Sequence, residues 1–344
     1  MTLKKFFYVL FAISLIFSSC KVSKENTATT TSFATEILKY TTVPEITEND
    51  IRWHISVLAS DSMQGRATST PYEAKAAEYI KEQFQFLGLK AFDDNYLQSI
   101  TCYSHRNVSG YGIIDVDEVM SQNVVGYLET ADSENENGYI VIGAHYDHVG
   151  TKKNDDSVEI YNGADDNASG VAGILEIAEK LKAGEKLKYN VIFAAFGAEE
   201  MGLVGSREFC NNPPVPLEKI KLMINLDMIG RMDSDNHVFI NTAEDTNLFS
   251  PLIDEIKKLH PDLNVDFALD SYLQGSDHTS FFNKKIPAIF FTTGTHKDYH
   301  KSTDTPDSIN YQGTKQLLDF VYDFVISPAM DSCIRSLTSS DVSP

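Results

Sequence analysis

The sequence predicts an α/β fold with three layers, in which helices cover both faces of a mixed, mostly parallel central sheet. Its short apolar runs are continuous rather than alternating, which is typical of strands buried on both faces. These runs alternate along the chain with segments of helical periodicity. The length of 344 residues, of which 42% are hydrophobic and 23% charged, suits one large α/β domain.

The expected elements follow one another from about Pro44 onward. Helical spacing of apolar residues predicts helices over residues 48–58, 71–87, 170–182 and 313–326. Apolar runs predict strands over residues 139–143, 190–196, 221–226 and 286–291. Residues 95–125 mix polar and β-branched types, and we expect them to form an extra hairpin that is too short for a separate domain.

The N-terminus has the pattern of an export signal. Lys4 and Lys5 precede an apolar run over residues 6–17, which is too short to span a bilayer comfortably, and small residues then lead to Cys20. The segment resembles a bacterial lipobox, although an ordinary signal peptide that ends near a cysteine would look similar. We expect the chain to be exported and lipid-anchored through Cys20, facing the periplasm or cell surface, with the choice of membrane and leaflet left open.

These features divide the chain into four parts. We expect a lipoprotein signal peptide over 1–19, a lipidated cysteine and flexible tether over 20–43, a catalytic domain over 44–328 and a C-terminal tail over 329–344. The oligomeric state is left open.

The charge and the cysteines exclude some function classes. The net charge is −20, which repels phosphate backbones, so nucleic acid is not an expected partner. No Cys-x-x-Cys pair suggests a thiolate metal site. If Cys20 carries lipid, Cys102, Cys210 and Cys333 remain, and whether any two of them form a disulfide is left open.

Side chains that bind metals follow the candidate strands. Because the carboxyl ends of parallel strands meet at one edge of a sheet, such residues are expected to converge there. The residues after the first three apolar runs are His145 and Asp147, Glu199 and Glu200, and Asp227. Asp165 and Asp166 open a helix, where capping alone would also explain them, and His300 follows the last run.

The types of these side chains favour a divalent metal. Two imidazoles and three carboxylates, from His145, Asp165, Glu200, Asp227 and His300, suit zinc. Five groups exceed what one tetrahedral zinc takes, but they suffice for two ions if one carboxylate bridges. Paired metals of this kind occur in aminopeptidases and phosphatases.

Six segments appear in the order found in one enzyme family: AHYDHVG, NGADDNASG, FGAEEMGLVGS, INLDMIG, GSDHTSFF and YHKSTDTPD, preceded by LASDSMQGRATST. With these motifs, residues from about 50 to 326 resemble the co-catalytic zinc exopeptidases of metallopeptidase family twenty-eight. That family includes bacterial leucyl aminopeptidase, aminopeptidase Y and the glutamate carboxypeptidases.

The resemblance implies two Zn²⁺ per chain and a role for each matching residue. His145 and Asp227 would hold one zinc, Glu200 and His300 the other, and Asp165 would bridge them. Glu199 would be the general base, and Asp147 would accept the ring N–H of His145. A cis peptide, common at this motif of the family, is expected between Asp165 and Asp166.

The resemblance implies hydrolysis of peptides, most simply by an aminopeptidase. Dipeptidase and carboxypeptidase activities share the same ligands, and substrate preference cannot be derived from the sequence. Two alternatives are a single-zinc enzyme similar to glutaminyl cyclases and a peptide-binding ectodomain that has lost catalysis.

Several residues near the motifs have open roles. His148 is an alternative ligand to His145, which we favour because His-x-Asp places Asp147 on the same strand face. Arg231 is expected to contact substrate or to pair with Asp233. The remaining open positions are Asp277 and His278, near the metals or the substrate, His296 and Asp298, in a loop, and Tyr272, in a pocket wall.

Overall fold

The computed structural model describes residues 45–109, 112–129, 137–155, 157–184, 187–242, 246–268 and 275–339. The expected signal peptide, Cys20, the tether to residue 43, and Tyr272 lie outside these residues. Among the described residues, no helix combines the length and apolar character needed to cross a membrane.

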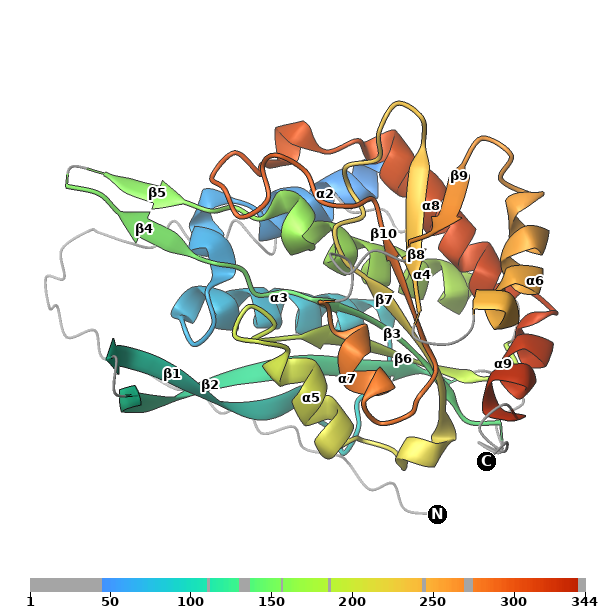
Figure 1. Ribbon diagram of the computed structural model, residues 1–344, viewed down its shortest axis with the longest axis horizontal. Coiled ribbons are helices and arrows are strands. Elements are labelled where there is room, and N and C mark those ends of the chain that lie inside the picture. Colours follow the sequence, from blue (N-terminus) through green and yellow to red (C-terminus); the bar gives the residue numbers. More distant parts are fainter. Residues whose placement is uncertain are drawn as a thin grey trace, which may run out of the picture. The chain divides into compact units, whose positions relative to one another are not determined.

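One mixed sheet of eight strands forms the centre of the described chain (Figure 1). Its order is β1-β2-β6-β3-β7-β10-β8-β9, and the four strands β6, β3, β7 and β10 are parallel to one another. The strands are β1 Leu97–Ser109, β2 Gly112–Leu128, β3 Tyr139–His145, β6 Asn190–Phe196, β7 Ile220–Leu226, β8 His237–Asn241, β9 Asn264–Phe267 and β10 Ala288–Thr292. A separate hairpin pairs β4 Thr151–Lys153 with β5 Val158–Ile160.

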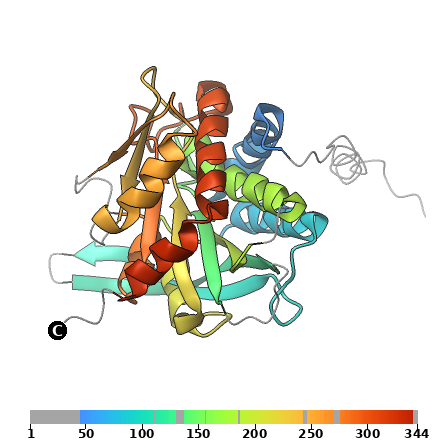
Figure 2. The ribbon, with the colours of Figure 1, turned by 90° about the vertical axis from the view of Figure 1, so that its right-hand side faces the viewer.

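Helices cover both faces of this sheet (Figures 1 and 2). One face packs against α2 Glu48–Leu58, α3 Pro71–Leu87, α4 Gly170–Ala183, α6 Thr246–Lys257, α8 Tyr311–Ile326 and α9 Met330–Ser339. The other face packs against the shorter helices α5 Val204–Asn211 and α7 His278–Phe282. Single helical turns or short helical segments occur at η1 Asp61–Arg66, η2 Ala164–Ser169, η3 Leu217–Lys219 and η5 Pro306–Ser308.

The continuous apolar strands follow from this two-sided cover. In β3, Ile140 and Ile142 join the core under the larger helical layer, while Tyr139 and Val141 join the core under α5 and α7. Successive side chains of a strand point to opposite faces, so a strand that is covered on both sides needs apolar residues at every position. The fold class that the sequence predicts is therefore confirmed.

Two expectations about the organisation need correction. The segment over residues 95–125 does form an antiparallel pair, but β2 also pairs with β6, so the hairpin is an edge of the central sheet rather than an addition to it. The segment over 329–344 is not simply a tail, because α9 buries Cys333, Ile334 and Leu337 in the main core. Their spacing places all three on one face of a helix.

The cysteines that the structure describes are free. Cys102, Cys210 and Cys333 are all buried. Burial raises the pKa of the Cys102 thiol to about 11, that of Cys210 to about 12 and that of Cys333 to about 11. No disulfide therefore joins any two of these three residues.

A buried guanidinium joins the segments that carry the strand-end residues. Arg66 has no exposed surface, and its N–H groups donate to the backbone carbonyls of Leu58, Tyr146, Asn162 and Gly163 at 2.6–3.0 Å. Burial lowers the pKa of Arg66 to about 10, although nearby carboxylates, Asp166 foremost, oppose this shift. One side chain therefore ties the end of α2 to the segment after β3 and to the segment before η2.

Arg66→Ala should lower the free energy of unfolding by about 3–5 kcal/mol, because it leaves several buried carbonyls without a donor and nearby carboxylates without a cation. Urea denaturation of the purified protein measures this loss. The matched control is Arg335→Ala, which removes an exposed ion pair with Asp331 and should cost less than about 1 kcal/mol. Equal, small losses in the two variants would show that Arg66 does not have this role.

Candidate metal centre

The strand-end residues meet at one edge of the sheet. The neighbouring strands β6, β3, β7 and β10 are parallel, and their carboxyl ends therefore lie side by side. The side chains placed there are Glu199 and Glu200 after β6, His145 at the end of β3, Asp227 after β7 and His300 in the loop after β10. The structure brings these residues together, as the sequence predicts.

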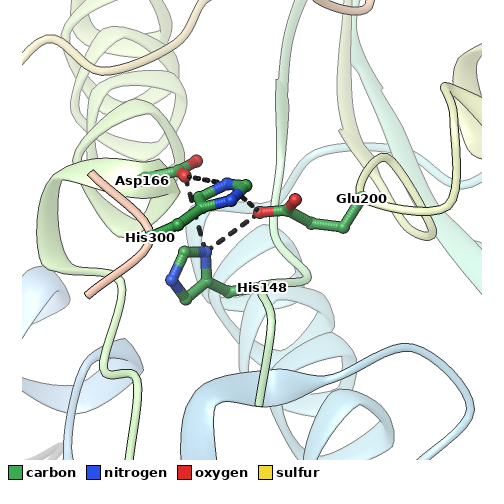
Figure 3. A group of neighbouring side chains, drawn as sticks. All are labelled: His148, Asp166, Glu200 and His300. Atoms are coloured by element: carbon green, nitrogen blue, oxygen red, sulfur yellow. Dashed lines mark hydrogen bonds and ion pairs between the residues drawn. The ribbon is translucent and has the colours of Figure 1, made fainter. Parts of the chain in front are cut away.

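One group of side chains consists of His148, Asp166, Glu200 and His300 (Figure 3). The Nε2 atom of His300 lies 3.1 Å from Asp166 Oδ2 and 3.2 Å from Glu200 Oε1. The Nδ1 atom of His148 lies 3.1 Å from the same Glu200 oxygen and 3.6 Å from Asp166 Oδ2. Nitrogen and oxygen ligand atoms thus converge from four separate segments.

A second group adjoins the first and shares Asp166 with it. His145 Nε2 lies 3.3 Å from Asp166 Oδ1 and 3.4 Å from Asp227 Oδ1. The two oxygens of Asp166 therefore face different groups, Oδ1 towards His145 and Oδ2 towards His300. This is the arrangement expected of a carboxylate that bridges two metal ions.

The resemblance places the bridging position at Asp165, but the aspartate that belongs to both groups is its neighbour Asp166. Asp165 Oδ1 instead accepts the backbone N–H of Gly230 at 2.6 Å, and Oδ2 lies 3.1 Å from His296 Nε2. Neither group of candidate ligands contains Asp165. The cis peptide likewise joins Asp166 to Asn167 and not Asp165 to Asp166.

Hydrogen bonds fix the backbone on which Asp166 sits. The carboxylate of Asp304 accepts the backbone N–H groups of Asp165 and Asp166 at 3.0–3.1 Å. Asn167 donates to the carbonyl of Leu226 at 3.0 Å, which joins η2 to the end of β7. The loop is therefore held from two sides.

Arg231 supports this loop through Asp304. Its Nη2 atom lies 3.2 Å from Asp304 Oδ1 and 3.3 Å from Asp298 Oδ2. The expectation that Arg231 contacts substrate or pairs with Asp233 is wrong on the second point, because Asp233 pairs with His237 at 2.8 Å.

Asp147 acts on the backbone of the neighbouring strand end. Its carboxylate accepts the N–H of Glu199 at 2.9 Å, the N–H of Glu200 at 3.3 Å and the hydroxyl of Thr68 at 2.9 Å. The ring of His145 lies too far for the expected hydrogen bond, with 3.8 Å between Nδ1 and Asp147 Oδ1, and it approaches the backbone carbonyl of Asp147 at 3.2 Å instead. The Asp147 carboxylate therefore positions both glutamates.

A short chain of hydrogen bonds orients Asp227. Asn225 donates to Ser276 Oγ at 2.7 Å, and this hydroxyl donates to Asp227 Oδ2 at 2.7 Å. The other oxygen, Oδ1, is buried without a hydrogen-bond partner and faces His145. Because buried polar atoms normally have partners, this oxygen is suited to a cation.

The backbone is strained where these side chains are presented. Ala198, which precedes Glu199, has φ 54°, Met228, which follows Asp227, has φ 56°, and His300 itself has φ 52°. Non-glycine residues in this left-handed region each cost on the order of 1–3 kcal/mol and tend to cluster at functional sites.

The pKa of Glu199 indicates how its charge depends on neighbouring cations. Burial raises the pKa of the Glu199 carboxyl to about 10, and the charge of His145 only partly opposes this shift. The negative charges of Asp277, Asp227 and Asp147 raise it further. A divalent cation beside Glu199 would reverse these effects and favour the carboxylate form.

The imidazoles of the two groups are held by carboxylates. Hydrogen bonds that His300 donates to the carboxylates of Asp166 and Glu200 raise the pKa of His300 to about 10. Burial lowers the pKa of His145, but the charges of Asp227 and Glu199 dominate and raise it well above its ordinary value. Since a histidine ligand must be neutral, metal binding at these groups releases protons and strengthens as the pH rises.

A cavity of about 460 Å³ opens onto the two groups, and both glutamates face it. Its walls are formed by His145, Asp166, Glu199, Glu200, Asp227, Met228, Gly275, Ser276, Phe290, Thr292, Gly294, Thr295, His296 and Tyr299. The volume falls in the range of small-molecule sites. His296 lies in the loop after β10, as the sequence predicts, and it also contributes to the cavity wall.

The structure also shows where the residues of α7 and of the last loop lie whose roles the sequence leaves open. Asp277 and His278 are fully buried, and neither lines the cavity. His278 stacks on Phe290 with ring centroids 4.7 Å apart. Asp298 accepts from Thr303 at 2.7 Å and pairs with Arg231, so it is a loop residue, as expected.

The comparisons with known proteins agree with this geometry. A family model described as "Peptidase family M28" matches residues 123–325. The chain is 32% identical over 276 residues to the uncharacterized protein YfbL of Escherichia coli (strain K12), covering 72% of this chain and 78% of that protein. The chain belongs to peptidase family M28.

Other relatives of this M28 member carry functional names. Leucine aminopeptidase 2 of Trichophyton rubrum is 28% identical over 249 residues, covering 65% of this chain and 48% of that protein. The chain thus spans about half the length of this relative. The zinc aminopeptidase BSAP from Bacillus subtilis is 18% identical, with a TM-score of 0.65, covering 82% of this chain and 95% of that chain. The family resemblance and the fold are therefore both confirmed.

The two neighbouring aspartates of this M28 member allow a matched test. Asp166→Asn removes the charge shared by both groups and should weaken metal binding more than about 100-fold, with loss of bound metal during gel filtration. Asp165→Asn keeps an oxygen for the Gly230 N–H and should retain the metal content of the unaltered protein. Mass spectrometry of metals gives the content of each variant. The reverse pattern, with metal lost only from the Asp165 variant, would return the bridge to Asp165.

Proposed function

We propose that this M28 member is a zinc-dependent aminopeptidase that uses two zinc ions. The observation that carries the proposal is the placement of Asp166, whose two oxygens face two adjacent groups of ligand atoms. Paired metals bridged in this way are typical of aminopeptidase sites.

The residues present fit such ions. His145, Asp166 and Asp227 would hold one ion, and Asp166, Glu200 and His300 the other. The donor set of imidazole and carboxylate suits zinc. Asp227 Oδ1 is buried without a hydrogen-bond partner, and a bound cation would satisfy it.

The chemistry that these ions supply when bound is a more acidic water molecule and a polarised carbonyl group. Glu199 lines the cavity beside both groups and is placed to accept the proton of the attacking water. It would then deliver this proton to the leaving amine. Its backbone N–H is held by Asp147, which keeps the carboxyl directed at the cavity.

The charge of the cavity favours the amino end of a peptide. Asp166, Glu199, Glu200 and Asp227 all contribute to its walls, and their four negative charges offset the four positive charges of two zinc ions. No excess positive charge is then left to attract a terminal carboxylate, whereas carboxylate oxygens can accept hydrogen bonds from an α-amine. Met228 and Phe290 supply an apolar part of the wall against which a side chain can pack. Relatives of this chain are named aminopeptidases, which also supports binding of the amino end of a peptide.

Glu199→Gln should lower kcat about 10²–10⁴-fold while metal content stays the same, because it removes the proton acceptor without removing a ligand. Hydrolysis of aminoacyl reporters and short peptides by the zinc-loaded protein measures the effect, and Glu218→Gln on the exposed surface is the matched control. Near-normal turnover by the Glu199 variant would exclude it as the base.

The same substrate panel separates the alternatives. Release of residues from the carboxyl end would favour a carboxypeptidase, and cleavage limited to dipeptides would favour a dipeptidase. One metal ion per chain with cyclisation of N-terminal glutamine would favour a glutaminyl cyclase activity. Two bound zinc ions without any turnover would favour a peptide-binding ectodomain.

We further propose that the chain is exported and anchored to a bacterial membrane by lipid on Cys20. The support is the basic start, the apolar run over residues 6–17 and the small residues before Cys20. Cells fed a labelled fatty acid should incorporate label into the protein and retain it with the membranes. Cys20→Ala should abolish both, and unlabelled protein in the membrane fraction would contradict the proposal.

A further inference from the structure

His148 is a second imidazole at the group that contains His300. It follows Asp147 directly in the chain and is only 1% exposed. Figure 3 shows its Nδ1 atom directed at Glu200 and Asp166, beside the ring of His300. His148 is not among the described residues that line the cavity.

The distances within this group fit a four-coordinate ion. Zinc bonds to nitrogen and oxygen of 2.0–2.1 Å in a tetrahedron place the ligand atoms about 3.3 Å from one another. The observed separations are 3.1 and 3.6 Å from His148 Nδ1 and 3.1 and 3.2 Å from His300 Nε2, in each case to Glu200 and Asp166. The two imidazoles therefore occupy equivalent positions about one point.

We propose that His148 is a fourth protein ligand to the ion held by Asp166, Glu200 and His300. The inference rests on the proposed metal-dependent function and adds a residue to it. The assignment corrects the expectation that His148 is an alternative ligand to His145, because the two histidines belong to different groups.

The fold holds His148 in this position independently of any ion. Its backbone N–H donates to the carbonyl of Arg66 at 3.3 Å. Its ring packs against Gly163, where a Cβ would lie 2.6 Å from His148 Cγ and Cδ2, and where φ is +59°. Glycine is therefore required at position 163 both by the backbone conformation and by the ring.

A fourth ligand makes the two ions unequal. Zinc sites with four protein ligands are typical of structural ions, whereas catalytic zinc keeps one position open. The group around His148 is complete, while His145, Asp166 and Asp227 leave a position open towards the cavity. The ion at the His148 group is thus the tightly held one, and the ion at the His145 group is the one that exchanges and contacts substrate.

Cobalt substitution tests this assignment without reference to activity. Metal-free, full-length protein is titrated with Co²⁺, whose visible absorption is strong in four-coordinate sites and weak in six-coordinate ones. We expect the first equivalent to produce the strong bands. In His148→Gln these bands should weaken, and the affinity of that equivalent should fall more than about 100-fold, beyond the effect of an outer hydrogen-bond partner.

His148→Cys provides the second variant. A thiolate at this position can bond to cobalt, since the longer metal–sulfur bond compensates for the shorter side chain. We expect tight binding to return together with a thiolate-to-cobalt charge-transfer band, which only a direct ligand produces. His237→Gln, at a partly exposed histidine paired with Asp233, is the matched control and should leave the titration unchanged.

The competing explanation is that His148 donates a hydrogen bond to Glu200 without touching the ion. In that case His148→Gln would lose no more than about 100-fold in affinity, the strong bands would remain, and His148→Cys would show no charge-transfer band. Those results would overturn the inference and leave the two-ion function intact. If instead the unaltered protein binds fewer than two ions, the proposed function itself fails.

Discussion

The site depends on one carboxylate that must face in two directions. Asp166 can serve both groups only if its backbone is fixed, because a free aspartate would turn both oxygens towards one imidazole. The carboxylate of Asp304 accepts the backbone N–H groups of Asp165 and Asp166, and the side chain of Asn167 donates to the carbonyl of Leu226 at the end of β7. Arg231 in turn holds Asp304. The negative charges of the two groups are thus arranged by hydrogen bonds before any ion arrives.

The central sheet and Arg66 bring the remaining groups to this carboxylate. Parallel strands place His145, Glu200 and Asp227 at adjacent strand ends, but the loops between strands and helices must also be aligned. The guanidinium of Arg66 performs that alignment by binding carbonyls from three segments at once. Its charge also offsets part of the repulsion among the buried carboxylates. A neutral side chain of similar volume would supply neither effect.

The sequence was sufficient for the sheet, the strand ends and most of the side chains at the site. It failed where the position of a side chain depends on backbone geometry, which the periodicity of apolar residues does not reveal. The choice between Asp165 and Asp166 depends on the turn of η2, and two adjacent aspartates carry no local signal that separates them. Asn167, Ser276 and Thr68 were missed because a polar residue in a loop does not reveal which distant atom it will contact. Arg66 and Asp304 lay in recognised motifs, and the full burial of their charges was the feature that sequence alone could not show.

The three buried thiols determine how the domain responds to reducing agents and to reagents that label cysteine. No cross-link between them contributes to the fold, so the domain needs no oxidising catalyst to mature and should tolerate reducing agents. High thiol pKa values also keep Cys102, Cys210 and Cys333 in their unreactive form at neutral pH. A cysteine introduced at an exposed position of the domain should therefore react selectively with thiol-directed labels, because Cys102, Cys210 and Cys333 react slowly.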